Sequence, residues 1–387
     1  MVNVRTPTLE PEKIMLKRVI IALLVIGTLF PAGCTREWEV TPTNRDKRTL
    51  LVYLAGDNDL SNEVADKTRA LLDGWNPALG QLLVFTDTYG ETPVLTRAVA
   101  DNGKVMTDTL MVYSETNSAS PRLLREVIND TRRLAPATSY GMILFSHATG
   151  WLPAGAFDNP LAWRPAATRS LFKDGTREME LMDFVAAIPD GMFDFMVFDM
   201  CFMAGVEVAY ALRGKTPLMI ATATEILSPG FTPVYRAHLS ALYNPEADLS
   251  AFADAFFNYF DALEGVYRSA TVSVIRTAET EPLVRLIKDI SPKLTPTEIE
   301  NIQHFDRKGK PRLFFDLGDY LHATAKTDEQ HRQVDDALAR AVVFKKQTSR
   351  LINLDILKHS GLSIYIPQEG LSELNEAYKE TSWAKAM

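Results

Sequence analysis

The sequence contains two residues whose types suit nucleophilic catalysis, His147 and Cys201. His147 directly follows the apolar run Gly141–Ser146, and Cys201 comes shortly after the apolar run Phe193–Phe198. A thiolate attacks carbonyl carbons, and a nearby imidazole can take the thiol proton. Taken singly, a histidine after a strand is more often an ordinary loop residue, and a lone cysteine is more often an inert core residue. Together, at equivalent ends of two predicted strands, they predict a catalytic pair.

The segment after Cys201 predicts a helix over Met203–Leu212, with the small residues Ala204 and Gly205 at its start. A thiol at a helix N-terminus has its anion stabilised by the helix dipole and by unpaired N–H groups, which lowers the thiol pKa. We therefore expect Cys201 to be an activated nucleophile.

Short strands that alternate with helices must position this pair. Each predicted strand is apolar at consecutive positions, which is typical of a sheet covered on both faces. The strands are predicted at Leu50–Ala55, Gln81–Thr86, Gly141–Ser146, Phe193–Phe198 and Pro217–Ala223, with helices near Ser61–Leu72, Ser120–Leu134, Glu178–Ile188 and Met203–Leu212. This order indicates an α/β fold with a mostly parallel sheet and crossover helices.

Two further segments complete the predicted organisation. A turn signal, Asp101-Asn102-Gly103, lies between Val94–Ala98 and Val105–Val112 and predicts a β-hairpin inserted between the second strand and its crossover helix. After residue 230, helices are predicted at Leu249–Leu263, Glu279–Ile290 and Asp328–Phe344, with apolar runs at Ala270–Ile275 and Gly361–Ile366. We expect an α/β core at 49–230 and a helical C-terminal portion at 231–387 packed on it.

The first 33 residues have the pattern of a signal peptide. The apolar stretch Val19–Phe30 follows two basic residues and is shorter than the roughly 20 residues that span a bilayer. It leads to Pro31-Ala-Gly-Cys34, which looks like the box at which bacterial lipoproteins are cleaved and acylated. We therefore expect an exported protein, periplasmic or at the cell surface, anchored to the membrane by a lipid on Cys34 with residues 34–48 as a tether. The alternative is ordinary cleavage nearby, which would release a soluble secreted protein.

The charge of the chain argues against one class of partner. Its 387 residues carry a formal net charge of −8, which argues against nucleic acid. The runs Asn44–Arg48 and Lys345–Lys346 are interpreted as solvated charges. No spacing of potential ligands indicates a zinc site.

Several segments resemble the clostripain-type cysteine peptidases of the caspase–gingipain–legumain clan, over roughly residues 48–387. The histidine segment, GMILFSHATGW, is similar to the family's strand followed by His-Gly-Gly-Gly-Trp. The cysteine segment, FDFMVFDMCFMAGVEVAYAL, is similar to its Phe-Asp-Ala-Cys-Leu-Met-Ala-x-Val-Glu-Val-Ala-Tyr element, and LLVYLAGDNDL and GLSIYIPQEG are similar to further landmarks. The resemblance implies a caspase-like sandwich and a cysteine endopeptidase that works through an acyl-enzyme.

By this resemblance, Cys201 is the nucleophile and His147 the general base, and the backbone N–H groups of Cys201 and Ala148 hold the oxyanion. The family favours cleavage after arginine or lysine, so peptides or proteins with these residues are the expected substrates. Asp199 is the first candidate for the acid that binds the basic side chain, with capping of the helix after Cys201 as its alternative role. Glu225 is a second candidate acid.

Two residues beside the pair depart from the family's pattern. Ala148 stands where the family has glycine, which would restrict the backbone if a positive φ is needed there. Met200 replaces an alanine next to Cys201, and its bulk could narrow the site. These departures leave open a catalytically silent surface lipoprotein that binds through the same fold. Another cysteine-dependent acyl transfer, such as transpeptidation, is a further alternative.

Relatives cut themselves between the histidine and cysteine segments. We expect self-cleavage after Lys173 or Arg177, because Lys-Asp-Gly-Thr-Arg indicates an exposed loop that unfolds easily. Some relatives use calcium, but no loop here has a defined set of oxygen ligands, so calcium is an option implied only by the resemblance. No other cofactor is expected.

Three further acids receive ordinary roles. Asp57 and Asp59 follow the first predicted strand and are interpreted as turn-forming and helix-capping residues. Glu207, in the predicted helix after Cys201, is interpreted as a solvated or packed side chain rather than a catalytic one.

Overall fold

The computed structural model describes residues 47–163, 171–291 and 293–387, which belong to one compact unit. The predicted signal peptide at 1–33, Cys34 and the tether up to residue 46 lie outside the described residues. Within the described part, no helix is both long and apolar enough to cross a membrane.

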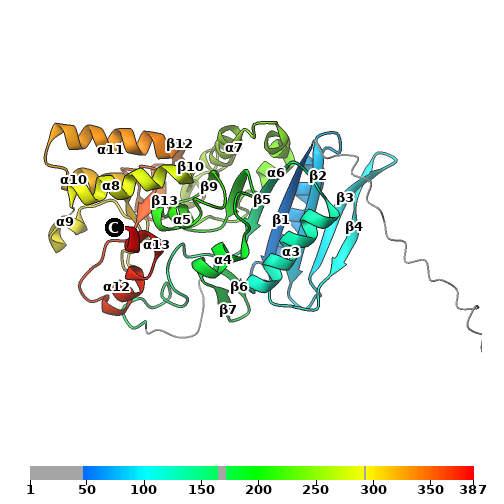
Figure 1. Cartoon of the computed structure of the whole chain (residues 1–387), viewed down its shortest axis with the longest axis horizontal. Coiled ribbons are helices and arrows are strands. Elements are labelled where there is room, and N and C mark those ends of the chain that lie inside the picture. The colour runs from blue at the N-terminus through cyan, green and yellow to red at the C-terminus, as the bar shows by residue number, and fades with distance from the viewer. Residues whose placement is uncertain (1–46, 164–170, 292) are drawn as a thin grey trace, which may run out of the picture. The chain divides into compact units, whose positions relative to one another are not determined.

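A nine-stranded sheet forms the centre of the fold (Figure 1). Its order is β12-β10-β9-β8-β5-β1-β2-β3-β4. The five central strands, from β9 to β2, pair in parallel, and the two strands at each edge pair antiparallel. The strands are β1 (Arg48–Gly56), β2 (Gly80–Thr88), β3 (Val94–Asp101), β4 (Lys104–Val112), β5 (Ser139–Phe145), β8 (Phe195–Asp199), β9 (Leu218–Ala221), β10 (Thr271–Arg276) and β12 (Val342–Gln347). The predicted α/β fold with a mostly parallel sheet is confirmed.

Continuous burial explains why the central strands are apolar at consecutive positions. Every residue of β1 is buried, and successive side chains such as Val52 and Tyr53 enter opposite cores. A strand with helices on both faces needs apolar side chains on both, because neither face reaches water. The five strands predicted from apolar runs are therefore all present.

The predicted β-hairpin is also present. Strands β3 and β4 pair antiparallel and turn at Asn102 and Gly103, whose φ angles are 50° and 76°. Both residue types tolerate this left-handed backbone, which a tight hairpin requires. The hairpin follows β2 and precedes α3 (Pro121–Leu134), as predicted.

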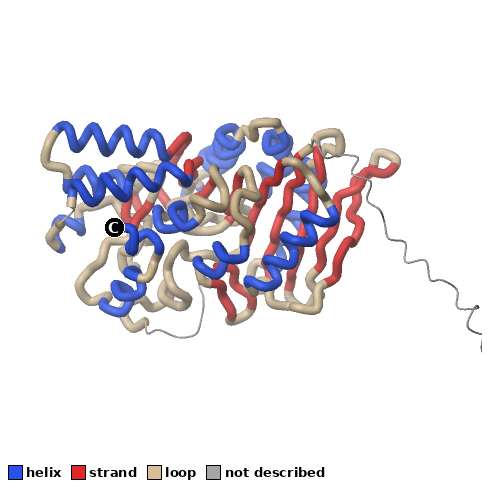
Figure 2. The backbone as a smooth tube through the Cα atoms, viewed as in Figure 1, coloured by secondary structure: helices blue, strands red, loops and turns tan. Residues whose placement is uncertain are grey.

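Helices cover both faces of the sheet, as the tube in Figure 2 shows. In Figure 1, α3 lies in front of β1 and β2. One core contains side chains of α3, α4 (Leu181–Ala187), α5 (Val206–Ala211), α8 (Thr280–Ile290), α10 (Leu317–Thr324), α11 (Asp328–Ala341), α12 (Ser372–Lys379) and α13 (Ser382–Ala386). The other core contains side chains of α2 (Ser61–Gly74), α6 (Thr232–His238) and α7 (Leu249–Asp261). A short helix, α9 (Pro296–Glu300), completes the set of α-helices in the described residues.

The portion after residue 230 extends the sheet as well as packing on it. Its strands β10 and β12 form the edge next to β9. The helix predicted to run to Phe344 ends at Ala341, and β12 follows with an alternation of half-buried and exposed residues. Three pairs of short strands lie outside the main sheet: β6 (Leu171–Asp174) with β7 (Arg177–Met179), β11 (Phe315–Asp316) with β15 (Ser363–Ile364), and β13 (Arg350–Leu351) with β14 (Leu354–Asp355).

Arg48, one of the charges interpreted as solvated, has another role. Arg48 is buried in β1, where its guanidinium donates hydrogen bonds to the carbonyls of Leu242 and Asn244 at 2.6 Å. Lys345 is exposed, as interpreted, and its ammonium also donates to the carbonyl of His359. The sequence pattern missed the role of Arg48 because its two carbonyl partners lie 194 and 196 positions later in the chain.

Candidate active site

The two candidate catalytic residues leave neighbouring parallel strands at matched positions. Phe145 at the end of β5 pairs with Asp199 at the end of β8. His147 and Cys201 each lie two residues beyond this pair, so both emerge at the carboxyl edge of the sheet, where reactive groups gather in parallel sheets. Both residues line the same two pockets, which we call the first pocket (about 240 Å³) and the second pocket (about 250 Å³). The structure thus brings together the pair predicted from the sequence.

The surroundings of Cys201 differ from the prediction. Cys201 lies in a turn, and α5 begins only at Val206 with Gly205 as its N-cap, so the thiol is not at the N-terminus of this helix. Burial raises the pKa of the thiol to about 12. The N–H of Ile226, which donates to Sγ at 3.3 Å, opposes this rise, and the nearby carboxylates of Glu225 and Asp199 add to it. The predicted lowering of this pKa by a helix dipole is therefore wrong. The thiol is protonated at neutral pH until a base takes its proton.

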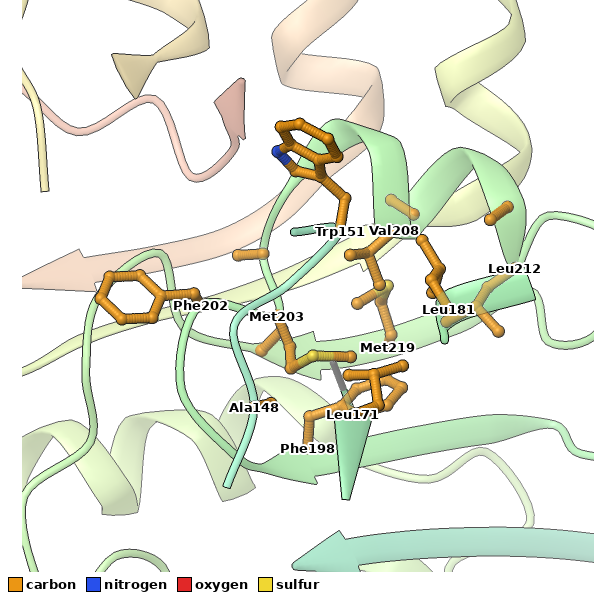
Figure 3. Close-up of a cluster of buried hydrophobic side chains, with 14 of the residues drawn as sticks. Ala148, Trp151, Leu171, Leu181, Phe198, Phe202, Met203, Val208, Leu212 and Met219 are labelled. Carbon is orange, nitrogen blue, oxygen red and sulfur yellow. The ribbon is translucent and has the colours of Figure 1, made fainter. Parts of the chain in front are cut away.

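The turn after Cys201 is held in a strained conformation. Phe202 has a φ of 58°, in the left-handed region that non-glycine residues rarely adopt. Its N–H donates to the carbonyl of Thr224 at 3.0 Å, and its buried ring stacks on Phe314 with a centroid separation of 4.2 Å. Figure 3 shows Phe202 and Met203 leaving this turn among the buried apolar side chains. Packing and backbone hydrogen bonds therefore fix where Cys201 points.

The histidine loop packs directly on the cysteine loop. A β-carbon added at Gly150 would lie 2.7 Å from the carbonyl oxygen of Phe202, and Gly150 has a φ of 63°. Only glycine combines this close approach with that backbone. Ala148, by contrast, has no positive φ and forms a bridge with Leu171, so the alanine there causes no backbone strain. Met200 is buried in the core and lines the first pocket.

An acid that the sequence interpretation placed in a turn contacts the candidate base. Asp59 Oδ1 lies 2.8 Å from Nε2 of His147, and this hydrogen bond lowers the pKa of the Asp59 carboxyl. The capping role is wrong for Asp59, because α2 has Leu60 as its N-cap and no side-chain capping bond. The position of Asp59 just after β1, which is adjacent to β5, was the available signal.

The first pocket contains both acids proposed for substrate recognition. Asp199 is buried and accepts hydrogen bonds from Lys67 Nζ at 2.7 Å and from the Tyr235 hydroxyl at 2.9 Å. Glu225 forms an ion pair with Arg307. Asp199 does not cap α5, so its alternative role is wrong. Each acid is close to the site, and each already has a cationic partner within the chain.

The second pocket contains Lys173, one of the two predicted processing positions. Lys173 lies in β6, where its N–H donates to Ser146 Oγ at 3.2 Å and its carbonyl accepts from Asn58 Nδ2 at 2.6 Å. Arg177 is exposed at the start of β7. The exposed loop predicted for this segment is instead a β-hairpin, whose first strand is tied to the edge of the sheet.

Glu207, the acid in the helix after Cys201, is structural. Glu207 is buried in α5 and accepts a hydrogen bond from the N–H of Tyr365 at 2.8 Å. Burial raises its pKa to about 7.

Among residues 47–163, 171–291 and 293–387, no three His, Cys, Asp or Glu residues are grouped so that they could hold a metal ion. No step of the chemistry is therefore assigned to calcium.

Comparison with models of protein families identifies the family to which the chain belongs. Residues 52–373 match the model of Peptidase_C11, the clostripain family. The chain belongs to the clostripain family. It is therefore a cysteine peptidase, with the caspase-like α/β fold of that family.

Solved structures agree with this membership. An inactive zymogen C11 protease from Parabacteroides distasonis is 30% identical, with a TM-score of 0.77 over 89% of this chain and 98% of its own. Two structures of secreted C11 cysteine proteases from Bacteroides thetaiotaomicron share the fold. One, in complex with an irreversible peptide inhibitor, is 24% identical with a TM-score of 0.75, covering 88% of this chain and 99% of its own. The other, called iotapain, is 21% identical with a TM-score of 0.78, covering 89% and 99%. Among curated proteins, none matches the sequence.

Proposed function

We propose that this clostripain-family peptidase hydrolyses peptide bonds with Cys201 as nucleophile and His147 as general base. Cys201 Sγ attacks the scissile carbonyl carbon while His147 takes the thiol proton and passes it to the departing amine. Water then hydrolyses the thioester and restores the thiol. The observation that carries the proposal is the placement of both residues two positions beyond a matched strand pair, lining the same two pockets.

Two further groups support this chemistry. Asp59 binds Nε2 of His147, which leaves Nδ1 as the nitrogen for the thiol proton. The N–H groups of Cys201 and Ala148 are the proposed donors to the oxyanion. Because burial raises the thiol pKa, a base is needed to take the proton, and His147 is the proposed one.

The proposed specificity is cleavage after arginine or lysine. Its support is the charge of the first pocket, where the described lining residues include three carboxylates, Glu63, Asp199 and Glu225, but only two permanent cations, Lys67 and Arg307. The excess of negative charge favours a cationic side chain. Asp199 and Glu225 are the acids that the family resemblance nominates for it.

Purified protein from residue 35 onward, tested on a peptide library, checks both parts of the proposal. Cleavage products should end in arginine or lysine, and Cys201→Ala and His147→Ala should each remove nearly all activity while the melting temperature stays near that of the wild type. A folded Cys201→Ala or His147→Ala variant with full activity would show that the residue is not part of the machinery.

We also propose export and lipid anchoring through Cys34. Its support is the signal-peptide pattern at 1–33, together with the description of the Bacteroides thetaiotaomicron relatives as secreted. Metabolic labelling with a radioactive fatty acid should mark the wild type and not Cys34→Ser. Unlabelled wild-type protein in the culture medium would instead indicate ordinary signal cleavage.

Self-cleavage after Lys173 or Arg177 is the last part of the proposal. The exposure of Arg177 supports cleavage there between molecules, whereas the hydrogen bonds of Lys173 mean that β6 must first detach. Intact mass spectrometry of the wild type beside Cys201→Ala measures it. An active wild type that remains one chain would exclude processing as a requirement.

A further inference from the structure

Lys67 on α2 is completely buried, with 0% of its side chain exposed, beneath the candidate catalytic site. Its ammonium donates to Asp199 Oδ2 at 2.7 Å, to the carbonyl of Pro229 at 3.0 Å and to Thr232 Oγ1 at 3.1 Å. An ammonium has three donors, so all of them have partners within the chain. Lys67 also lies 4.2 Å from the centre of the Phe145 ring. A lysine held this way is a fixed part of the pocket.

Asp199 is engaged on both of its oxygens. Oδ2 accepts from Lys67 and from the Tyr235 hydroxyl, and Oδ1 accepts from the N–H of Phe231 at 3.3 Å. Bidentate binding of a guanidinium requires both carboxylate oxygens in a geometry that faces the ligand. A substrate arginine could bind Asp199 in that way only by displacing Lys67 and breaking its three hydrogen bonds.

Glu63, one helical turn before Lys67, is the most loosely paired acid of the first pocket. Its carboxylate lies 3.8 Å from Lys67 Nζ, beyond hydrogen-bond distance, and its side chain is 25% exposed. Asp199 and Glu225 both make hydrogen bonds to their cations. Glu63 therefore combines access to solvent with an incompletely compensated charge.

We propose that Lys67 is an internal cation that satisfies Asp199 at the floor of the first pocket, and that Glu63 is the acid that binds the basic side chain of the substrate. This inference rests on the proposed function, because it names the residue that reads the proposed substrate. Because Lys67 occupies Asp199, a substrate side chain cannot reach as deep into the first pocket as it could if Asp199 had no partner in the chain. Asp199 thereby becomes a structural residue, and specificity moves to α2.

The test compares hydrolysis of peptides that differ only in the residue before the scissile bond: arginine, lysine or leucine. Glu63→Gln should lower kcat/KM for the arginine and lysine peptides about fivefold relative to the leucine peptide, the size expected of a partly exposed charge pair. The double variant Lys67→Met/Asp199→Asn removes the buried pair without leaving a buried charge unpaired. It should keep the preference for basic residues. Asp66→Asn, on an exposed acid of the same helix outside the pocket, is the matched control and should change nothing.

Several outcomes would overturn the inference. If the double variant loses the preference for arginine and lysine while Glu63→Gln keeps it, Asp199 is the acid that binds the basic side chain of the substrate. A wild type without any basic preference overturns the proposed specificity and the role of Glu63, but Lys67 is still tested by Lys67→Met. That variant, with Asp199 released, should gain cleavage after arginine. A folded Lys67→Met variant with no such gain rejects Lys67 as the internal occupant, and thermal unfolding of each variant establishes that it is folded.

Discussion

The strained backbone at Phe202 allows a prediction in which two substitutions at one position separate two effects. Truncating a buried phenylalanine costs about 3–5 kcal/mol, and both Phe202→Ala and Phe202→Gly lose the ring that stacks on Phe314. The left-handed φ of 58° costs a residue with a β-carbon about 1–2 kcal/mol, and glycine avoids this cost. Glycine has more backbone entropy to lose, worth about 0.5–1 kcal/mol.

The magnitudes predict that glycine is penalised less at position 202 than at an ordinary buried position. Both variants should be less stable than the wild type, because lost packing exceeds relieved strain. The strain that glycine relieves roughly offsets its lost methyl and its added chain entropy, so Phe202→Gly and Phe202→Ala should differ in stability by less than about 1 kcal/mol. At an ordinary buried position the glycine variant would be the weaker one.

Urea unfolding at equilibrium measures these differences from the midpoints at a common slope. Ala204, two residues further on, is buried without a positive φ and provides the control. Ala204→Gly should destabilise by about 1–2 kcal/mol, through a lost methyl and added chain entropy. A Phe202→Gly variant that is less stable than Phe202→Ala by the full ~1–2 kcal/mol expected at position 204 would refute the assignment of strain to the turn that carries the nucleophile.

Three other outcomes follow from the geometry of the site. Iodoacetamide should alkylate Cys201 slowly at neutral pH in the absence of peptide and faster as the pH rises, because burial raises the thiol pKa to about 12 and only the thiolate reacts. Mass spectrometry measures the labelling, and fast labelling at pH 7 would contradict this expectation. Asp59→Asn should lower kcat/KM about fivefold and not by orders of magnitude, because the Asp59 side chain is 72% exposed and solvent screens its ion pair with His147. Unchanged kinetics would show that Asp59 does not assist His147. Gly150→Ala should destabilise the fold and lower activity, because its β-carbon would lie 2.7 Å from the Phe202 carbonyl oxygen. A melting temperature equal to that of the wild type would show that the histidine and cysteine loops are not in close contact.

The local sequence pattern was sufficient to predict most of the strands and helices. Runs such as Leu50–Ala55 are apolar at every position because β1 has a core on each face, so residue type alone indicates which positions are buried. The Asn102-Gly103 turn was equally visible, since few residue types adopt its backbone. The C-terminal strand β12 was missed, because its alternating pattern continues a helical one without a break and its partner β10 lies about 70 residues earlier.

The same distinction applies to the site. The sequence alone determined that His147 and Cys201 lie at strand ends, because strand and loop can be read from neighbouring residues. Only the tertiary structure decided that Asp59 contacts His147, that α5 begins beyond Cys201, and that Lys67 donates a hydrogen bond to Asp199. Lys67 and Asp199 are 132 positions apart, and a lysine in an amphipathic helix ordinarily points to water. Lys67 on α2 reaches Asp199 at the end of β8 only in the folded chain, and no local pattern encodes that contact.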